Sequence, residues 1–230
     1  MASCFSYLVF ALVVHLGLGP IWDLSSYEYS GVFDFGYAVL FAMVGTAFGW
    51  SFIYCTKFFK TVFEKRPIPI YIKTFIGGML LGIIAYYFPI TRYFGHHQIN
   101  ELLNGSFTLP LLIAILISKI IAISITVTSG WRGGFIIPLF FVGATLGLIL
   151  HALFPDINLT LAVVSCMAAI NVCVTRTPMS TTILLATLTG FGHFIPILFA
   201  SLTAYFLAPK IPFINSQKEP LSKHSNTSSE

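Results

Sequence analysis

Residues 128–138 of this chain, TSGWRGGFIIP, form the stretch that decides its fold. They join two apolar runs, at about 109–128 and 138–154, each close to the roughly 20 residues that a membrane-spanning helix needs. The stretch itself is too polar and too rich in glycine to cross lipid as a helix. Non-helical backbone at membrane depth is tolerated only inside protein or against a cavity, because its N–H and C=O groups need partners. We therefore expect the stretch to line a cavity or to lie inside the protein.

A helix N-terminus is expected directly after Gly133 and Gly134. Pro138 suits the first turn of that helix, where its missing N–H would be unpaired in any case. A helix N-terminus carries about half a positive charge and several free N–H donors, and glycines let an ion approach without obstruction by Cβ. The pattern predicts an anion site. A glycine-containing turn that only joins two spans is the alternative interpretation.

The composition excludes a soluble globular protein. Of the 230 residues, 57% are hydrophobic and 9% are charged, against about 25% charged in soluble domains. The first apolar run lacks a basic segment before it and is interpreted as a retained span rather than a cleaved signal peptide. We expect an all-α, multi-pass membrane domain over residues 1–210 and a polar cytoplasmic tail over 211–230. The apolar runs lie at about 4–22, 37–59, 71–89, 109–128, 138–154, 159–174, 178–190 and 194–208.

The basic residues predict the orientation of the chain. Counting loops alternately places ten of them on one side and only Arg92 on the other, and loops rich in Lys and Arg are cytoplasmic. Both termini are therefore expected in the cytoplasm, and the chain is expected in the plasma (inner) membrane. Lys119 lies within a span, where we expect it to reach the interface or to bond backbone carbonyls. The ten residues are Lys57, Lys60, Lys65, Arg66, Lys73, Arg132, Arg176, Lys210, Lys218 and Lys223.

The sequence contains no pattern that is typical of other classes of function. The basic residues are scattered, so no nucleic-acid partner is expected. The four cysteines have no C-x-x-C spacing, and no catalytic pattern of His, Asp or Glu occurs, so we expect no metal, no cofactor and no enzyme activity. Glycine pairs four residues apart permit close helix contact, chiefly inside one bundle. They are Gly45 and Gly49, Gly78 and Gly82, and Gly143 and Gly147.

Two segments resemble the CLC family of chloride channels and chloride/proton antiporters. The run GGFIIP at 133–138, followed by FVGATLG at 141–147, resembles the G-x-F-x-P segment of that family. The run TRTPMST at 175–181, after Ala168 and Ala169, resembles its alanine-rich helix followed by R-x-P. The resemblance covers nearly the whole chain but only the second half of a CLC subunit. It implies half of an inverted-repeat helical bundle with re-entrant and short helices, in a homodimer whose contact lies near the first, seventh and eighth runs.

The resemblance also implies the site residues. In such proteins the backbone amides that correspond to Phe135 and Ile136 face the central anion, within the motif formed by Gly133, Gly134 and Pro138. Ile136 stands where the family usually has Phe. The family's anion-contacting Tyr near its last cytoplasmic helix has its nearest counterpart here in Phe213, which has no hydroxyl to donate. Arg176 is interpreted either as a residue that attracts entering anions or as an orientation anchor.

The family's first-half segments are missing from this sequence. Neither G-S-G-I-P, nor G-K/R-E-G-P with its gating glutamate, nor the inner proton-transfer glutamate occurs here. We therefore expect chloride transport that needs a missing amino-terminal half, with the lipid bilayer and chloride as partners. A non-conducting remnant or a membrane assembly partner is the alternative. Channel and antiporter both stay open.

Overall fold

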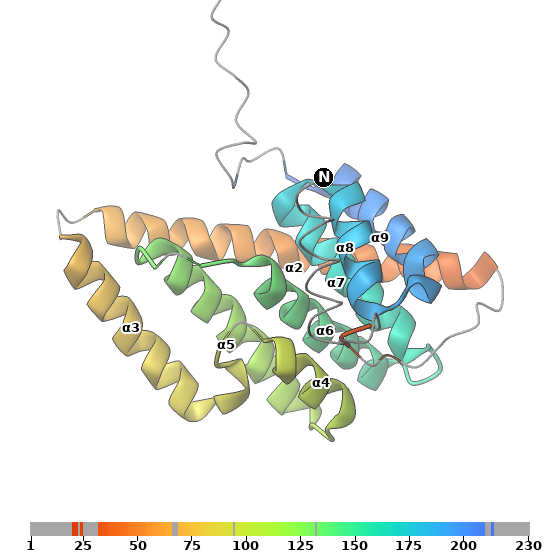
Figure 1. The fold of residues 1–230 in the computed structure, drawn as a ribbon, viewed down its shortest axis with the longest axis horizontal. Helices are drawn as coiled ribbons and strands as arrows, with labels where there is room; N and C mark the ends of the chain where they lie inside the picture. The colour runs from red at the N-terminus through yellow and green to blue at the C-terminus, as the bar shows by residue number, and fades with distance from the viewer. Residues whose placement is uncertain are drawn as a thin grey trace, which may run out of the picture.

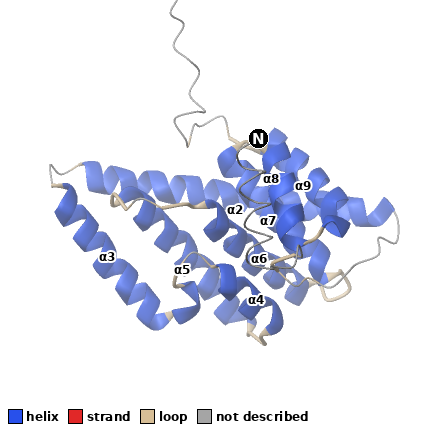
Figure 2. Ribbon diagram, in the orientation of Figure 1, coloured by secondary structure: helices blue, strands red, loops and turns tan. Residues whose placement is uncertain are grey.

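A computed structural model describes residues 20–22, 24, 32–65, 69–93, 95–131, 133–209 and 213. Every regular element in these residues is a helix (Figure 2). The α-helices are α2 (Val32–Glu64), α3 (Ile70–Tyr87), α4 (His96–Asn104), α5 (Leu109–Thr128), α6 (Ile136–Leu153), α7 (Leu159–Thr175), α8 (Pro178–Thr189) and α9 (Phe194–Leu207). Two short 3-10 helices, η1 (Pro89–Thr91) and η2 (Phe191–His193), precede α4 and α9. The all-α prediction is confirmed for these residues.

The helices follow the predicted apolar runs with two instructive differences. Helix α2 extends beyond the run at 37–59 to Glu64. Its last turns are more polar than the run and carry the exposed side chains of Lys57 and Lys60. Helix α3 ends at Tyr87, two residues before Pro89, which disfavours a helical conformation for the residue that precedes it. Most of the run at 4–22 and all of the tail at 211–230 except Phe213 lie outside the described residues, so the predicted domain boundary stays a prediction.

Helix α7 is the centre of the bundle. All of its residues from Thr160 to Thr175 are buried, and it contacts α2, α6, α8 and α9. Glycines let two neighbours approach it closely: a Cβ at Gly143 or Gly147 of α6, or at Gly45 or Gly49 of α2, would lie 2.4 to 2.9 Å from an atom of α7. Both glycine pairs therefore pack helices inside one bundle, as expected.

Helix α3 lies apart from this bundle. Figure 1 shows α3 and α5 descending from one end of α2, while α7, α8 and α9 gather toward the other end. Only 6% of α3 is buried, against 61% of α6. A Cβ at Gly82 would meet no atom within 4 Å, and one at Gly78 would meet the ring of Trp131 at 3.5 Å, so this pair does not pack against another helix within the described residues. The neighbouring space is a cavity instead.

Among the described residues, four helices are long and apolar enough to cross a membrane, namely α2, α3, α5 and α6. The helices α7, α8 and α9 are apolar but shorter, and α7 and α8 form a hairpin around Arg176 and Thr177. The described residues thus combine spanning helices with short ones, as the sequence predicts. The break at 129–135 between α5 and α6 is also where the sequence places it.

Candidate anion site

Helix α6 begins directly after the two glycines of the break. Its N-cap is Phe135, whose carbonyl accepts the N–H of Leu139 at 3.0 Å, and Pro138 lies buried in the first turn. The N–H groups of Phe135, Ile136 and Ile137 find no acceptor among the residues that the structure describes. The predicted helix N-terminus is confirmed, and its first turn presents free donors.

The glycines before α6 contribute openness rather than an unusual backbone conformation. Gly133 and Gly134 are exposed, and a Cβ on either would meet no atom within 4 Å. Positive φ angles occur among the described glycines at Gly95, Gly130 and Gly190 instead. Neither Gly133 nor Gly134 therefore adopts a left-handed backbone. What they provide is an unobstructed approach to the donors.

Two cavities meet at Phe135. The glycine cavity, about 460 Å³, is lined by Gly133, Gly134, Phe135 and Pro138 together with residues of α3, η1 and α5. The lysine cavity, about 590 Å³, is lined by Lys57, Lys60 and Lys73 together with the turn at 127–130, Phe135 and Phe213. Phe135 and Val127 line both cavities. Ile136 lines neither, and its side chain is 38% exposed.

Phe213 packs directly on Phe135. The two ring centroids lie 5.4 Å apart in an edge-to-face arrangement, and the ring of Phe213 also lies 5.5 Å from that of Phe52. An aromatic pair therefore stands between the two cavities. Phe213 is brought to the site as the resemblance implies, and its ring supplies apolar contact where a phenol would supply a hydrogen bond.

Lys119 places a positive charge in the wall of the glycine cavity. The side chain is 2% exposed, and its Nζ donates to the carbonyls of Thr91 at 2.8 Å and Tyr93 at 3.0 Å. The ring of Phe141 lies 4.8 Å from Nζ. The expectation that Lys119 bonds backbone carbonyls is confirmed. No carboxylate of the described residues lies within ion-pair distance of its Nζ.

Asn171 braces the first turn of α6, and sequence reasoning missed it. Its side chain is 1% exposed, and Nδ2 donates to the carbonyl of Ile136 at 3.0 Å. The feature of the sequence that could have indicated its role is that Asn171 is a single carboxamide within the apolar run at 159–174. Such a group is costly in an apolar interior unless it has a partner. Its presence could have indicated a bond to a neighbouring helix, but not to which residue.

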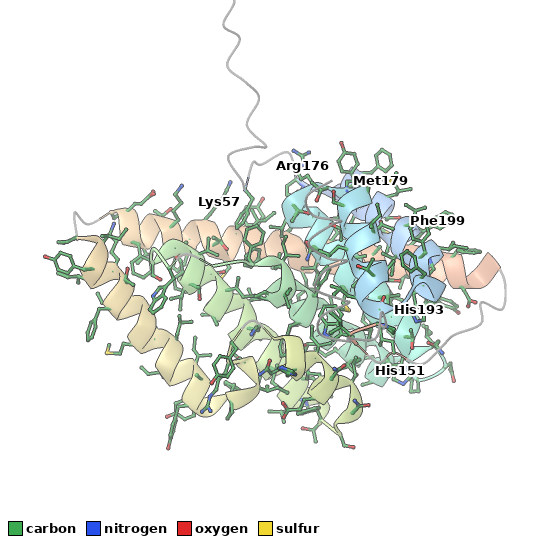
Figure 3. All side chains as sticks on the ribbon, in the orientation of Figure 1. Lys57, His151, Arg176, Met179, His193 and Phe199 are labelled. Atoms are coloured by element: carbon green, nitrogen blue, oxygen red, sulfur yellow. The ribbon has the colours of Figure 1, made fainter. Side chains whose placement is uncertain are left out.

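Arg176 lies away from both cavities. It is the C-cap of α7 with φ of 58°, its Nε is buried without a hydrogen-bond partner among the described residues, and it lines neither hollow. Figure 3 shows Arg176 and Lys57 along one edge of the molecule and His151 toward the opposite edge. Arg176 and Lys57 therefore share one edge of the described residues, and their predicted cytoplasmic position stays a prediction. Arg132 lies outside the described residues.

The glycine cavity is not accompanied by a metal site in the described residues. They include no group of three His, Cys, Asp or Glu side chains that could hold a metal ion. The glycine cavity has no Asp or Glu in its lining. Its chemistry is that of backbone N–H donors, the buried ammonium group of Lys119, the guanidinium of Arg92 and largely apolar walls, which suits the binding of an anion.

Comparison with known protein families gives one extended match. The model of the family described as "Voltage gated chloride channel" matches residues 1–209. Among curated proteins, the chain is 28% identical over 205 residues to an uncharacterized protein, MJ0305, of Methanocaldococcus jannaschii, covering 89% of this chain and 51% of that protein. It is 26% identical over 183 residues to the putative ion-transport protein YfeO of Escherichia coli O1:K1 / APEC, covering 77% of this chain and 44% of that protein.

Two solved structures share the fold. A CLC-type fluoride/proton antiporter matches with a TM-score of 0.72 at 19% identity, over 88% of this chain and 50% of that one. A slow cyanobacterial Cl⁻/H⁺ antiporter matches with a TM-score of 0.66 at 18% identity, over 84% of this chain and 47% of that one. The chain therefore spans about half the length of the relatives that it matches.

Proposed function

The chain belongs to the voltage-gated chloride channel family, and on that premise we propose that it supplies one half of a chloride pathway across a membrane. The anion lies at the start of α6, against the N–H groups of Phe135 and Ile136, where the glycine cavity meets Phe135. Gly133 and Gly134 leave its approach open, and Pro138 fixes the first turn. The aromatic pair of Phe135 and Phe213 borders the passage toward the lysine cavity.

The observation that carries this proposal is the set of free donors at the start of α6, next to a cavity that holds a buried ammonium group. The N–H groups of Phe135 to Ile137 have no described acceptor, and Phe135 lines the glycine cavity together with the buried Lys119. A hydrogen bond to a charged group contributes about 1.5 to 3 kcal/mol. Two such bonds offset part of the dehydration of a chloride ion without holding it too tightly to leave.

The proposed pathway is incomplete in this chain alone. Inverted-repeat transporters form their ion sites from two halves, and this chain spans about half of its relatives' length. We propose that an amino-terminal half completes the site and that two complete units form a homodimer. Because no acid of the described residues lines the glycine cavity, we propose that any proton-transferring acid of the assembly belongs to that amino-terminal half.

The test is chloride efflux from liposomes loaded with potassium chloride. The purified chain alone is expected to release chloride little faster than empty vesicles. The chain fused behind the first half of the archaeal relative is expected to release it several-fold faster. Rapid efflux from the chain alone would contradict the half-pathway. Absence of efflux from both preparations would favour a non-conducting remnant or an assembly partner, and a faster fluoride than chloride efflux would reassign the anion.

The orientation of the chain is tested separately. The loop that holds Lys65 is proposed to face the cytoplasm, because ten Lys and Arg residues are predicted on that side. A cysteine introduced as Lys65→Cys, with the native cysteines replaced by alanine, should resist an impermeant thiol reagent in intact cells. It should react once the membrane is permeabilised. Labelling in intact cells would reverse the proposed topology.

A further inference from the structure

The lysine cavity gathers several positively charged side chains around one hollow, which the orientation of the chain in the membrane alone does not explain. Lys57 and Lys60 come from the last turns of α2 and Lys73 from the first turn of α3, and all three border one hollow of about 590 Å³. Among the described residues of this lining Glu64 is the only acid, and its Oε1 lies 3.8 Å from the Nζ of Lys60. Three ammonium groups and one carboxylate leave the lining with an excess of two positive charges.

The remaining wall is apolar or already hydrogen-bonded. Phe63, Ile70 and Val127 form much of it. The hydroxyl of Thr56 donates to the carbonyl of Phe52 at 2.9 Å, and that of Thr128 donates to the carbonyl of Ser124 at 2.7 Å. The lysines are therefore the main donors. The volume falls within the roughly 300–1,000 Å³ of ordinary ligand pockets and far exceeds that of one dehydrated halide.

Exposed apolar side chains flank this cavity on both helices. They are Phe58 and Val62 on α2 and Ile70, Tyr71 and Phe75 on α3, each at least half exposed. In a membrane-spanning protein such side chains face lipid, and a Tyr near the end of a spanning helix marks the headgroup level. The cavity thus lies where a phosphate group and the acyl chains attached to it can be accommodated together. A free phosphate ion would use only the lysines.

We propose that the lysine cavity binds the phosphodiester headgroup of an anionic phospholipid. Lys57, Lys60 and Lys73 donate to the phosphate oxygens, and the acyl chains lie along the exposed faces of α2 and α3. Basic pockets between membrane helices recognise such headgroups by the same chemistry. Because Phe135 lines this cavity too, a bound headgroup lies beside the residue that also borders the glycine cavity. The proposal concerns lipid binding alone and does not depend on chloride transport.

The test counts lipids that stay on the purified 230-residue chain. The chain is reconstituted into phosphatidylcholine nanodiscs that contain phosphatidylglycerol, and native mass spectrometry then counts the lipids retained. The triple variant Lys57→Gln, Lys60→Gln, Lys73→Gln should retain about tenfold less phosphatidylglycerol than the unaltered chain. The control Lys65→Gln removes a lysine of the described residues that does not line this cavity and should retain it fully. Equal loss in both variants, or no loss in the cavity variant, would overturn the proposal.

A milder pair of variants guards against misfolding of the triple variant. Lys73→Arg keeps the charge and should keep the lipid, whereas Lys73→Gln should lower retention several-fold. Equal retention by these two variants would count against the site. Displacement of phosphatidylglycerol by millimolar inorganic phosphate would assign the cavity to the free ion and overturn the lipid assignment. Since no flux is measured, failure here leaves the chloride proposal as it stands.

Discussion

Two pairs of glycines at one helix have opposite surroundings. A Cβ at Gly143 or Gly147, within α6, would lie 2.4 or 2.5 Å from the backbone of α7, whereas a Cβ at Gly133 or Gly134, just before α6, would meet nothing within 4 Å. The first pair closes the contact between two helices, and the second keeps a cavity wall open. The same residue type is thus structural where backbone faces backbone and functional where backbone faces a cavity.

The largest effect is expected where the glycine faces backbone. Gly143→Val places a branched side chain against Met167, whose Cα and N lie 2.4 and 2.7 Å from the added Cβ and cannot move independently of α7. We expect a loss of at least about 3 kcal/mol of folding free energy, because overpacking of this kind forces backbone shifts. Thermal unfolding followed by size-exclusion chromatography in detergent measures it. Near-normal stability would show that α6 and α7 can move apart freely. It would contradict the view that Gly143 is required for close packing of these two helices.

A smaller loss is expected for Lys119→Met, on the cavity side. The carbonyls of Thr91 and Tyr93 lose their donor, while the cost of keeping an ammonium group buried disappears. We expect a net loss of about 2 kcal/mol, together with weaker chloride binding. The same unfolding measurement applies, with the exposed Lys65→Met as the matched control. A gain in stability would show that burial of the charge outweighs its two hydrogen bonds.

Asn171→Leu probes the support beneath the anion donors. The substitution removes the bond to the carbonyl of Ile136 and should cost about 1 kcal/mol, the usual net value of one hydrogen bond. Amide hydrogen exchange in a peptide that covers the first turn of α6 should become several-fold faster. Exchange in α9 serves as the control. Unchanged exchange in the first turn would show that Asn171 does not position it.

The smallest effect on stability is expected at the open pair. Gly134→Val should change the folding free energy by less than about 0.5 kcal/mol, yet in the completed assembly it should abolish chloride flux, since its side chain stands before the N–H donors. Ile136→Phe should keep the flux, because it leaves the backbone donor in place. Normal flux in Gly134→Val, with loss of flux in Arg132→Ala, would assign the anion to the guanidinium instead of the helix N-terminus.

Sequence reasoning reached the helices and the break between them because both follow from local chemistry. Apolar runs of sufficient length predict spans, Pro138 fixes the first turn of α6, and the lone charge of Lys119 in an apolar run demands polar partners. Each of these inferences needs only neighbouring residues. That is why the helix N-terminus after Gly134 and the carbonyl bonds of Lys119 were both predictable.

The division of the site into two cavities was not predictable from local chemistry. Lys57 and Lys73 belong to different helices, and only the packing of α2 against α5 and of α3 against α5 makes them line one hollow. Asn171 meets Ile136 across 35 positions of the chain. Gly82 looked like part of a packing pair and instead faces a cavity, because the pattern of small residues does not reveal whether a neighbour is present.

The shortness of α7 has a consequence for biogenesis. Its 17 residues reach about 25 Å at 1.5 Å per residue, less than the roughly 30 Å of a bilayer's hydrocarbon core. Released alone from the insertion machinery, it would carry Ser165, Asn171 and Thr175 into lipid, whereas in the folded chain all three are buried. Its contact with α9 forms only after later residues are synthesised. In a nascent chain that ends before Phe194, the side of α7 that packs against α9 in the folded protein would therefore still be uncovered.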